Sequence, residues 1–396
     1  MSTTEPLRLG MVGGGPGAMI GPTHRIAAHM YGDWRLVAGA FSRRLERNRA
    51  MGEELGLDPG RVYADYREMA RAESAREDGI EAVAVVTPND SHVPISECFL
   101  RRGIHVICDK PLANSTADAE ALRHAVRESG RVFALTHNYA GYPMVREARS
   151  RVLSGELGAV RIVQAEYASG ARSRLVEAEG DEKTAWRTNP AIGGPSAVLC
   201  DLGVHVHHLL RFVTGCEVEQ VSASLATVVP GRTSHDDAQV SLRLSGGVRG
   251  ALWASYVAAG CRNGVRLMVC GETGTLEWWQ EQPETLAIHA LGGSTLRLHR
   301  GDAGLSPDAR SATRRKPGQP EGFQEAFANV YSDVAAWIRT PAERRDGAPW
   351  PAAGVDDGVA GVRFIEACVA SDRDGARWVA GNAQICSQTA RTANDS

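Results

Sequence analysis

Lys110, Asp201 and His205 are the residues of this chain whose types and spacing best suit chemistry. Oxidation of a secondary alcohol needs a base for the hydroxyl proton while hydride leaves carbon, and a positive group to stabilise the developing alkoxide. Histidine suits the first task and lysine the second. Considered alone, His205 is better explained as a packed core histidine, so its interpretation as a base depends on the elements around it.

A helix over residues 201–214 is expected to place Asp201 and His205 on one face, because residues four apart are neighbours on a helix. Its opposite side is expected to be buried through an apolar stripe, made of Leu202, Val206, Leu209 and Val213. His207 and His208 also suggest metal ligands, but on a helix His207 points nearly opposite to His205. We therefore expect no metal site.

Lys110 directly follows an apolar strand, in the segment Ile104-His105-Val106-Ile107-Cys108-Asp109-Lys110-Pro111. Open α/β folds bind their ligands at the carboxyl edge of the sheet. A lysine at the end of such a strand is therefore expected to face a ligand.

A glycine-rich turn follows the first apolar strand of the chain. Gly13 and Gly15 fit the first two positions of the dinucleotide-binding pattern G-x-G-x-x-G/A, and Ala18 fits the third. These positions allow a tight turn and a close approach of the backbone to a diphosphate. The pattern is common by chance, but here it follows a strand and opens an alternating β/α region, which favours a cofactor site over a surface loop.

The end of the second strand bears on the choice between NAD and NADP, because an acid there binds the ribose hydroxyls and an arginine neutralises a 2′-phosphate. The residues are Phe41-Ser42-Arg43-Arg44, without an acid. NAD is the default expectation. Ser42 and Arg43 leave NADP open, since the arginines are equally explained as solvated residues at a helix start.

A third strand ends in Thr87-Pro88-Asn89, a turn that is expected to lie beside Lys110. The full set of residues expected to contact the cofactor is Gly13, Gly15, Ala18, Ser42, Arg43, Thr87, Pro88, Asn89, His92, Asp109, Lys110 and Asn138. The substrate is expected at Lys110, Tyr139, Trp186, Arg187, Asp201 and His205.

Composition limits the class of protein. The 396 residues, 43% of them apolar, can bury a full core in two domains. A net charge of −3 gives no indication of nucleic-acid binding, and the apolar runs are too short to span a membrane. No signal peptide is visible, so we expect a cytoplasmic protein. The eight cysteines are scattered without a C-x-x-C pair and are expected to be reduced.

The first part of the chain alternates short strands and helices, which predicts an N-terminal Rossmann domain with a doubly wound parallel sheet over residues 1–137. Strands are expected at 7–13, 35–41, 82–87, 105–108 and 132–136. Helices are expected at 43–55, 94–102 and 116–129.

Residues 138–396 change to strands with period-two alternation after a helix at 144–154, which predicts an α+β domain with a large, open, mainly antiparallel sheet. Strands are expected at 161–168, 218–228, 238–244, 250–256, 266–271 and 275–279. Residues 301–322 are expected to form an exposed excursion. Helices at 322–339 and 355–371 follow, and these final helices are expected to pack back on the first domain.

The chain resembles the glucose–fructose oxidoreductase, inositol dehydrogenase and rhizopine-catabolism (Gfo/Idh/MocA) family over almost its whole length. Asp109-Lys110-Pro111 resembles the family's E-K-P signature, with Asp in place of Glu, and Asp201-x-Gly203-x-His205 resembles its D-x-G-x-H motif. The glycine turn departs from the family spacing, as if three residues were inserted between Gly15 and Gly21.

The resemblance implies that Lys110 and His205 act in catalysis, that Asp201 orients the substrate or the lysine, and that the open sheet forms a homodimer or homotetramer. The expected activity is NAD(P)-dependent hydride transfer at a ring secondary alcohol of a sugar, cyclitol or glycoside. Two alternatives remain open: a non-catalytic NAD(P)-binding sensor or regulatory subunit, and a glycosidase-like enzyme that oxidises its substrate transiently.

An acidic stretch before Trp186 suggests an amino-sugar or aminoglycoside as substrate, because its carboxylates would attract ammonium groups. The stretch contains Glu177, Glu179, Asp181 and Glu182. Such a stretch is more often a solvated loop, so a neutral sugar or inositol is the broader expectation.

Overall fold

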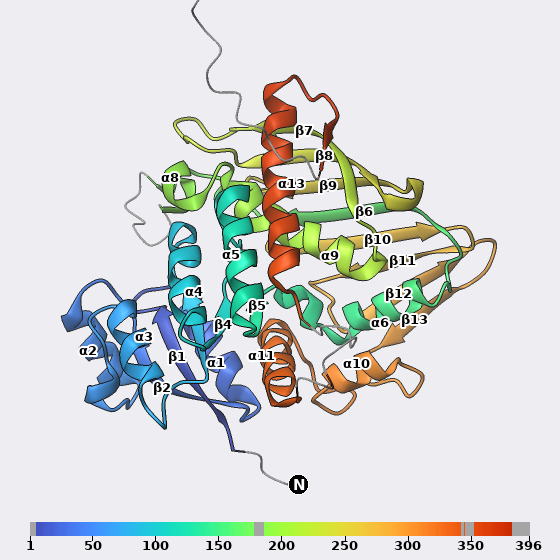
Figure 1. Cartoon of the computed structure of the whole chain (residues 1–396). Coiled ribbons are helices and arrows are strands. Elements are labelled where there is room, and N and C mark those ends of the chain that lie inside the picture. Colours follow the sequence, from blue (N-terminus) through green and yellow to red (C-terminus); the bar gives the residue numbers. More distant parts are fainter. Residues whose placement is uncertain (1–4, 178–185, 342–343, 345–351, 382–396) are drawn as a thin grey trace, which may run out of the picture.

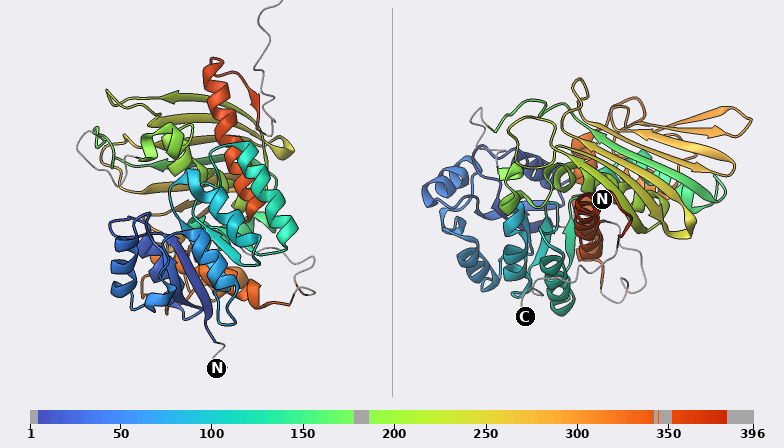
Figure 2. Two further views of the ribbon diagram at one scale, coloured as in Figure 1. Left: turned by 60° about the vertical axis from the view of Figure 1, so that its left-hand side comes forward. Right: turned by 90° about the horizontal axis from the view of Figure 1, so that it is seen from above.

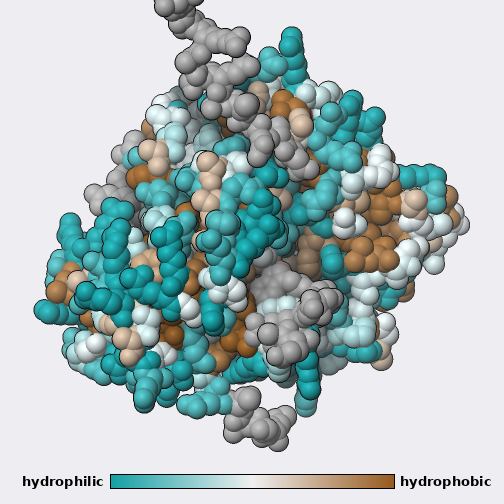
Figure 3. All heavy atoms as spheres, in the orientation of Figure 1, coloured by the Kyte–Doolittle hydropathy of each residue, from teal (hydrophilic) through white to brown (hydrophobic). Residues whose placement is uncertain are grey.

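A computed structural model describes residues 5–177, 186–341, 344 and 352–381 of the chain. Figure 1 shows two sheets, a small one in the N-terminal part and a large one built from the remainder, with helices between and around them. Among the described residues, no helix is long and apolar enough to cross a membrane. In Figure 3 the surface over α4, α5 and α13 is mainly hydrophilic.

The first sheet is parallel throughout, with strand order β2-β1-β3-β4-β5. Its strands are β1 (Leu7–Gly13), β2 (Trp34–Ala40), β3 (Ala82–Val86), β4 (His105–Cys108) and β5 (Phe133–Leu135). The linking helices are α1 (Gly21–Met30), α2 (Leu45–Glu54), α3 (Tyr66–Ser74), α4 (His92–Leu100) and α5 (Thr116–Ser129). The prediction of a doubly wound Rossmann sheet is confirmed.

The second sheet has nine strands in the order β13-β12-β11-β10-β6-β9-β8-β7-β14. Only the central pair, β6 (Val160–Ala168) with β9 (Arg249–Ser255), is parallel among the described pairs. The other strands are β7 (Val218–Ala226), β8 (Asp237–Leu244), β10 (Gly264–Gly271), β11 (Gly274–Trp279), β12 (Thr285–Ala290), β13 (Thr295–His299) and β14 (Val379–Ala380). The predicted large, mainly antiparallel sheet is confirmed, although β12, β13 and β14 were not predicted.

Helices from the second half of the chain pack against both halves of the structure. Helices α6 (Pro143–Leu153) and α9 (Val204–Thr214) pack against the large sheet. Helix α11 (Phe323–Arg339) packs on α1, and α13 (Val355–Arg373) packs on α5 and β7. Figure 2 shows α13 running alongside both α5 and the large sheet. Helices α11 and α13 therefore join the two halves into one packed unit.

Most residues of the segment 301–322 are exposed, as predicted, but a few buried residues anchor it to the fold. It contains α10 (Pro307–Ala312), which buries Ala309 and Ala312, and it ends at a buried ion pair between Arg300 and Glu321. The Arg/Pro/Gly/Ser composition predicts the exposure, but it does not show that Glu321 is buried and paired.

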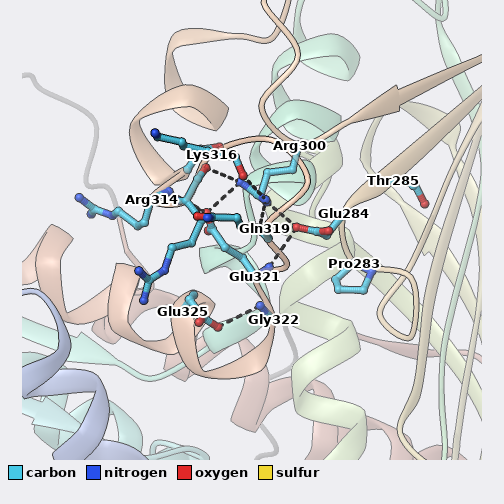
Figure 4. Close-up of polar contacts among 12 residues, drawn as sticks. Pro283, Glu284, Thr285, Arg300, Arg314, Lys316, Gln319, Glu321, Gly322 and Glu325 are labelled. Atoms are coloured by element: carbon cyan, nitrogen blue, oxygen red, sulfur yellow. Dashed lines mark hydrogen bonds and ion pairs between the residues drawn. The ribbon is translucent and has the colours of Figure 1, made fainter.

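Arg300 anchors this segment (Figure 4). Its guanidinium donates to Glu284 Oε1 at 2.6 Å, to Glu321 Oε1 at 2.9 Å and to the carbonyl oxygens of Arg315 and Gln319. Both side chains of the Arg300–Glu321 pair are only 2% exposed. The charges are tolerated in the interior because each one is matched by an opposite charge and by hydrogen bonds.

Replacing Arg300 by methionine is expected to destabilise the protein by about 3–5 kcal/mol, because the substitution leaves the Glu321 carboxylate buried without its countercharge. The free energy of unfolding in urea measures the effect. The double variant Arg300→Met/Glu321→Gln is expected to recover part of the loss. A single variant as stable as the wild type would show that the ion pair does not hold the segment.

Candidate active site

A cavity of about 590 Å³ lies at the carboxyl edge of the first sheet. One wall comes from the glycine turn, the end of β2, the turn after β3 and the segment after β4. The other wall comes from residues 186–201, which lead into α9. Of the residues predicted for the site, it is lined by Gly13, Gly15, Ala18, Ser42, Arg43, Thr87, Pro88, Asn89, Asp109, Lys110, Trp186, Arg187 and Asp201.

The glycine turn is held tightly between two strands and a helix. A side chain at Gly13 would meet the Val86 carbonyl oxygen at 2.2 Å, and Gly13 has a φ of +83°. A side chain at Gly21 would meet the Gly14 carbonyl oxygen at 2.5 Å. The close contact between α1 and the turn is therefore made at Gly21. Ala18 lines the cavity but does not make this contact, which corrects its assignment to the third glycine position.

Lys110 and Asp201 meet across the cavity. Lys110 Nζ lies 2.6 Å from Asp201 Oδ1 and 2.8 Å from the Asp201 carbonyl oxygen. Asp201 lies in a single π-helical turn, Leu199–Gly203, and not at the start of a regular α-helix as predicted. In this wider turn the Asp201 carbonyl accepts a hydrogen bond from a side chain far away in the sequence. Both oxygens thereby fix the position of the ammonium group.

The Asp201 carboxylate has further partners on its other oxygen. Tyr256 donates to Oδ2 at 2.7 Å, and the guanidinium groups of Arg172 and Arg187 lie 3.9 Å from the same atom. Burial alone would raise the pKa of Asp201, but the charges of Lys110, Arg187 and Arg172 hold that pKa well below its usual range. Asp201 is therefore ionised, and it forms an ion pair with Lys110.

His205 is buried in the first turn of α9, with 8% of its surface exposed. Its ring packs against His137, Tyr139 and Tyr167, with centroid distances of 5.6, 5.0 and 6.1 Å. Burial and the nearby charge of Lys110 lower the pKa of His205 well below its usual value, although the charge of Asp201 acts in the opposite direction. The imidazole is thus neutral at physiological pH and can accept a proton.

Asp109 supports the backbone of the lysine. Its Oδ1 accepts from the Lys110 backbone N–H and from Thr136 Oγ1, both at 2.9 Å, and His24 Nε2 lies 3.9 Å away. Burial would raise the pKa of Asp109, but His24 and the Lys110 charge keep it well below its usual range. This short carboxylate therefore turns back toward its own strand end, while the Lys110 side chain reaches across to Asp201.

Four of the predicted residues do not line the cavity but pack behind it. His92 lies close to the Pro111 and Thr87 carbonyl oxygens, at 2.7 and 2.9 Å, and so joins two of the strand ends. Asn138, Tyr139 and His205 are buried, and the Tyr139 and Tyr167 hydroxyl groups are hydrogen-bonded to each other. None of these four residues lines this cavity, so their direct contact with cofactor or substrate stays a prediction.

Trp186 and Arg187 form one unit, because the Arg187 guanidinium stacks on the Trp186 ring at 4.6 Å. Both residues line the cavity opposite the first sheet. In the acidic stretch before them, the Glu177 carboxylate pairs with Arg232 at 2.8 Å. The other three acidic residues, Glu179, Asp181 and Glu182, lie outside the described residues.

Sequence reasoning missed Tyr256, Arg172 and His137. Tyr256 was placed only at a strand end, and its bond to Asp201 spans 55 positions of the sequence. His137 stacks on His208 at 4.2 Å, and His207 stacks on Phe364 at 4.4 Å. Within the described ranges, no group of three His, Cys, Asp or Glu side chains is arranged to hold a metal ion.

The residues fit a bound dinucleotide. The strands behind the glycine turn leave no space for side chains on the turn, so the turn presents its backbone to the cavity. Helix α1 begins nearby, at Gly21. Both features suit a diphosphate. Beside them lie an ammonium group, a carboxylate and a neutral imidazole. These are the groups that an alcohol oxidoreductase needs.

Comparisons with known proteins agree with this class. Residues 7–137 match the model of an oxidoreductase family with an NAD-binding Rossmann fold, and residues 145–277 match a GFO/IDH/MocA C-terminal domain. The chain belongs to the Gfo/Idh/MocA oxidoreductase family. This family includes sugar and cyclitol dehydrogenases, so the resemblance stated from the sequence motifs is confirmed.

Two relatives match nearly the whole chain. The uncharacterized oxidoreductase YfiI of Bacillus subtilis is 33% identical over 386 residues, which are 95% of this chain and 97% of that protein. An inositol dehydrogenase homolog from Azotobacter vinelandii, solved in complex with NAD⁺, is 38% identical with a TM-score of 0.91, and the match covers 95% of this chain and 98% of that one. The same homolog is also solved with NADH and myo-inositol.

Gly21→Ala is expected to weaken NADH binding about tenfold, because the added methyl group overpacks the Gly14 backbone at a cost of about 1–3 kcal/mol. Fluorescence titration with NADH measures the dissociation constant. Ala18→Gly is the matched control and is expected to change the constant less than about twofold, since Ala18 makes no such contact. Unchanged binding in Gly21→Ala would contradict the role assigned to Gly21.

Proposed function

We propose that this protein is a dehydrogenase that transfers hydride between a nicotinamide cofactor and a ring secondary alcohol of a cyclitol or sugar. The observation that carries the proposal is the pairing of Lys110 Nζ with Asp201 Oδ1 at 2.6 Å, in a cavity shared with the glycine turn and next to a neutral, buried His205. A protein that only senses the cofactor has no need of this base and ammonium group.

In the proposed reaction, the substrate hydroxyl lies between Lys110 and His205. His205 takes the hydroxyl proton, and Lys110 stabilises the negative charge that develops on the oxygen. Asp201 acts as a positioning residue, because it holds the ammonium group through two oxygens. The nicotinamide ring, when bound, supplies the hydride acceptor. In reduction, the same residues return the proton to the carbonyl oxygen.

We assign cofactor binding to a domain of residues 1–137, and substrate binding and oligomerisation to a domain of residues 138–396. Two contacts between these parts support the division of labour. Lys110 reaches Asp201, and the Asn89 side chain donates to the Gly193 carbonyl oxygen at 2.8 Å. The substrate cleft thus lies between the two parts, next to the cofactor cavity.

A neutral polyol is the substrate we propose, and myo-inositol is the first candidate, since the Azotobacter vinelandii homolog is solved with it. An amino-sugar would need unpaired carboxylates at the cleft. Glu177 does not offer one, because it is paired with Arg232. An ammonium-bearing substrate is therefore the second candidate, to be separated from the first by experiment.

We further propose a homodimer or homotetramer formed through the large sheet. Helices α6, α9 and α13 lie on one side of this sheet, and Figure 2 shows its other side uncovered. That side carries Trp253 together with Arg266, which pairs with Glu166 and Glu277. Light scattering of the full chain measures the assembly.

The test of the function is turnover over a panel of inositols, neutral sugars and aminoglycosides, followed at the absorbance of the reduced nicotinamide. Turnover of a neutral ring polyol supports the proposal. Cofactor binding without any turnover would favour a sensor or regulatory subunit, and a cleaved glycoside with retained cofactor would favour a glycosidase. Better turnover of an aminoglycoside, with an efficiency that falls as salt rises, would favour the cationic substrate.

His205→Ala is expected to lower turnover by about 10²–10⁴-fold, because it removes the base. Lys110→Met is expected to be at least as damaging, because it removes the positive charge next to the alkoxide. NADH affinity measured by fluorescence checks that the cofactor still binds in each variant. Near-native turnover of His205→Ala at all pH values would show that another group is the base.

The pH profile of kcat/KM tests the electrostatics of the site. A base must be deprotonated to act, and the pKa of His205 lies well below its usual value, so we expect no acid limb near pH 6.5 in the wild type. Lys110→Met removes a positive charge that lowers this pKa, so its acid limb is expected to move to higher pH. An unshifted limb would contradict the coupling of the two residues.

A further inference from the structure

The ring of His137 lies between the proposed base and a second histidine. His137 follows β5 by two residues and is only 2% exposed. Its ring meets the His205 ring edge to face, with the centroids 5.6 Å apart. It stacks on the His208 ring with the centroids 4.2 Å apart and the planes 6° from parallel. Three imidazole rings therefore form a row that begins at His205 and ends at His208.

Several nitrogen atoms of this row are buried without a partner. In the described part of the chain, no hydrogen bond reaches Nδ1 or Nε2 of His137, or Nδ1 of His205. Buried polar atoms are nearly always hydrogen-bonded, and each exception calls for a reason such as a catalytic role. The proposed base and the ring beside it thus keep unused donors and acceptors in the interior.

The other aromatic neighbours of His205 are already engaged. The hydroxyl groups of Tyr139 and Tyr167 are hydrogen-bonded to each other, and both are hydrogen-bonded to Asn263. Burial also raises the pKa of both tyrosines well above the usual value, so neither gives up its proton readily. A neutral imidazole is different, because one ring nitrogen accepts a proton while the other donates one. Of the three described rings around His205, His137 is the one suited to exchange a proton with it.

His137 is uncharged at rest. Burial lowers its pKa well below the usual value. Four positive or protonatable groups act in the same direction, namely His208, His205, Lys110 and His207. At physiological pH, one nitrogen of His137 is therefore free to accept a proton.

The far end of the row leads toward exposed carboxylates. Burial lowers the pKa of His208 to about 4, with Asp357 acting in the opposite direction and Arg211 and Arg149 lowering it further. Arg211 lies three residues along α9 and pairs with Glu217 at 2.7 Å and with Asp357 at 2.9 Å. These two carboxylate side chains are 54% and 32% exposed. A proton at His208 is thus about one helical turn from groups that contact solvent.

We propose that His137 takes a proton from His205 during oxidation of the substrate and passes it toward His208. The inference rests on the proposed function, in which His205 is the base. While the carbinol gives up its hydride, its hydroxyl proton moves to Nε2 of His205. The proton on Nδ1 of the same ring moves to one nitrogen of His137, and the proton on the other nitrogen of His137 leaves toward His208. Both His205 and His137 end neutral. Reduction uses the same steps in reverse.

The tautomer of His205 tests the contact without turnover. Nitrogen NMR of the isotope-labelled full chain shows which ring nitrogen carries the proton, and the His205 signals are identified by their loss in His205→Ala. We expect the proton on Nδ1, because the hydrogen bond of one ring nitrogen sets the state of the other. His137→Phe keeps an aromatic ring in place and is expected to shift these signals. Unshifted His205 signals in His137→Phe would overturn the contact.

His207→Phe is the matched control for this substitution. His207 lies on the same helix as His205, is only 2% exposed and also has a buried Nδ1 without a partner in the described ranges. Its ring stacks on Phe364 instead of on the row. His207→Phe is therefore expected to leave the His205 signals and the turnover as they are in the wild type.

Turnover of a ring polyol tests the proton transfer itself. His137→Phe is expected to lower kcat by about 10²-fold, the lower end of what a positioned proton-transfer group contributes, with KM and NADH affinity nearly unchanged. The remaining rate is expected to rise with pH and to slow more in deuterated water than the wild-type rate does. The reason is that loss of the His205 proton to water has become the slow step.

A purely structural role of His137 gives a different result. Near-native kcat in His137→Phe would overturn the transfer, and so would a loss of kcat with weaker NADH binding and an unchanged solvent isotope effect. If His137→Phe does not fold, His208→Phe is expected to show the same isotope effect and rise with pH, and their absence would overturn the path. Lack of any polyol turnover by the wild type would overturn the proposed function and the transfer, whereas shifted His205 signals would still establish the contact of the two rings.

Discussion

The ion pair between Lys110 and Asp201 is the interaction on which the site depends, because it joins the two halves of the chain at the cavity. Both side chains are only partly exposed, and two opposite charges withdrawn from water are stable only when geometry and additional hydrogen bonds offset the loss of hydration. The Asp201 carbonyl and the Tyr256 hydroxyl supply those bonds. The same contacts fix the distance between the strand that carries the lysine and the helix that carries His205. The ion pair therefore sets both the packing of the two halves and the position of the proposed catalytic groups.

Much of the fold follows from local patterns. The alternation of apolar strands with helices predicted the five-stranded sheet, and the period-two segments predicted six of the nine strands of the large sheet. Three strands were missed. β13 is largely exposed at one edge of the sheet and β14 has only two residues at the other edge, so few buried side chains mark their period. β12 does bury Leu286 and Ile288 in alternation, but this short period was not recognised. The ends of elements moved by a residue or two, since they depend on caps and contacts as well as on pattern.

The sequence predicted the site residues that belong to motifs, but it did not predict contacts between residues that are far apart in the sequence. Lys110, Asp201 and His205 stand in recognisable surroundings, so the sequence located them. The partners of Asp201 are distant in the sequence: its carbonyl accepts from a lysine side chain 91 positions away, and its carboxylate accepts from Tyr256, which directly follows β9. The glycine spacing did show a departure, but only the packing of α1 on Gly14 identifies Gly21 as the contact.

The position of α11 has a consequence for how the chain reaches its native state. This helix lies late in the sequence but covers one face of the first sheet, where Tyr331 bonds to His24 at 2.8 Å and its carbonyl accepts from Trp34 at 2.9 Å. During synthesis, the first 137 residues therefore emerge with an apolar face that stays uncovered until nearly the whole chain is made. Completion of the cofactor domain is a late step of biosynthesis, and a chain truncated before Phe323 leaves a surface open to aggregation.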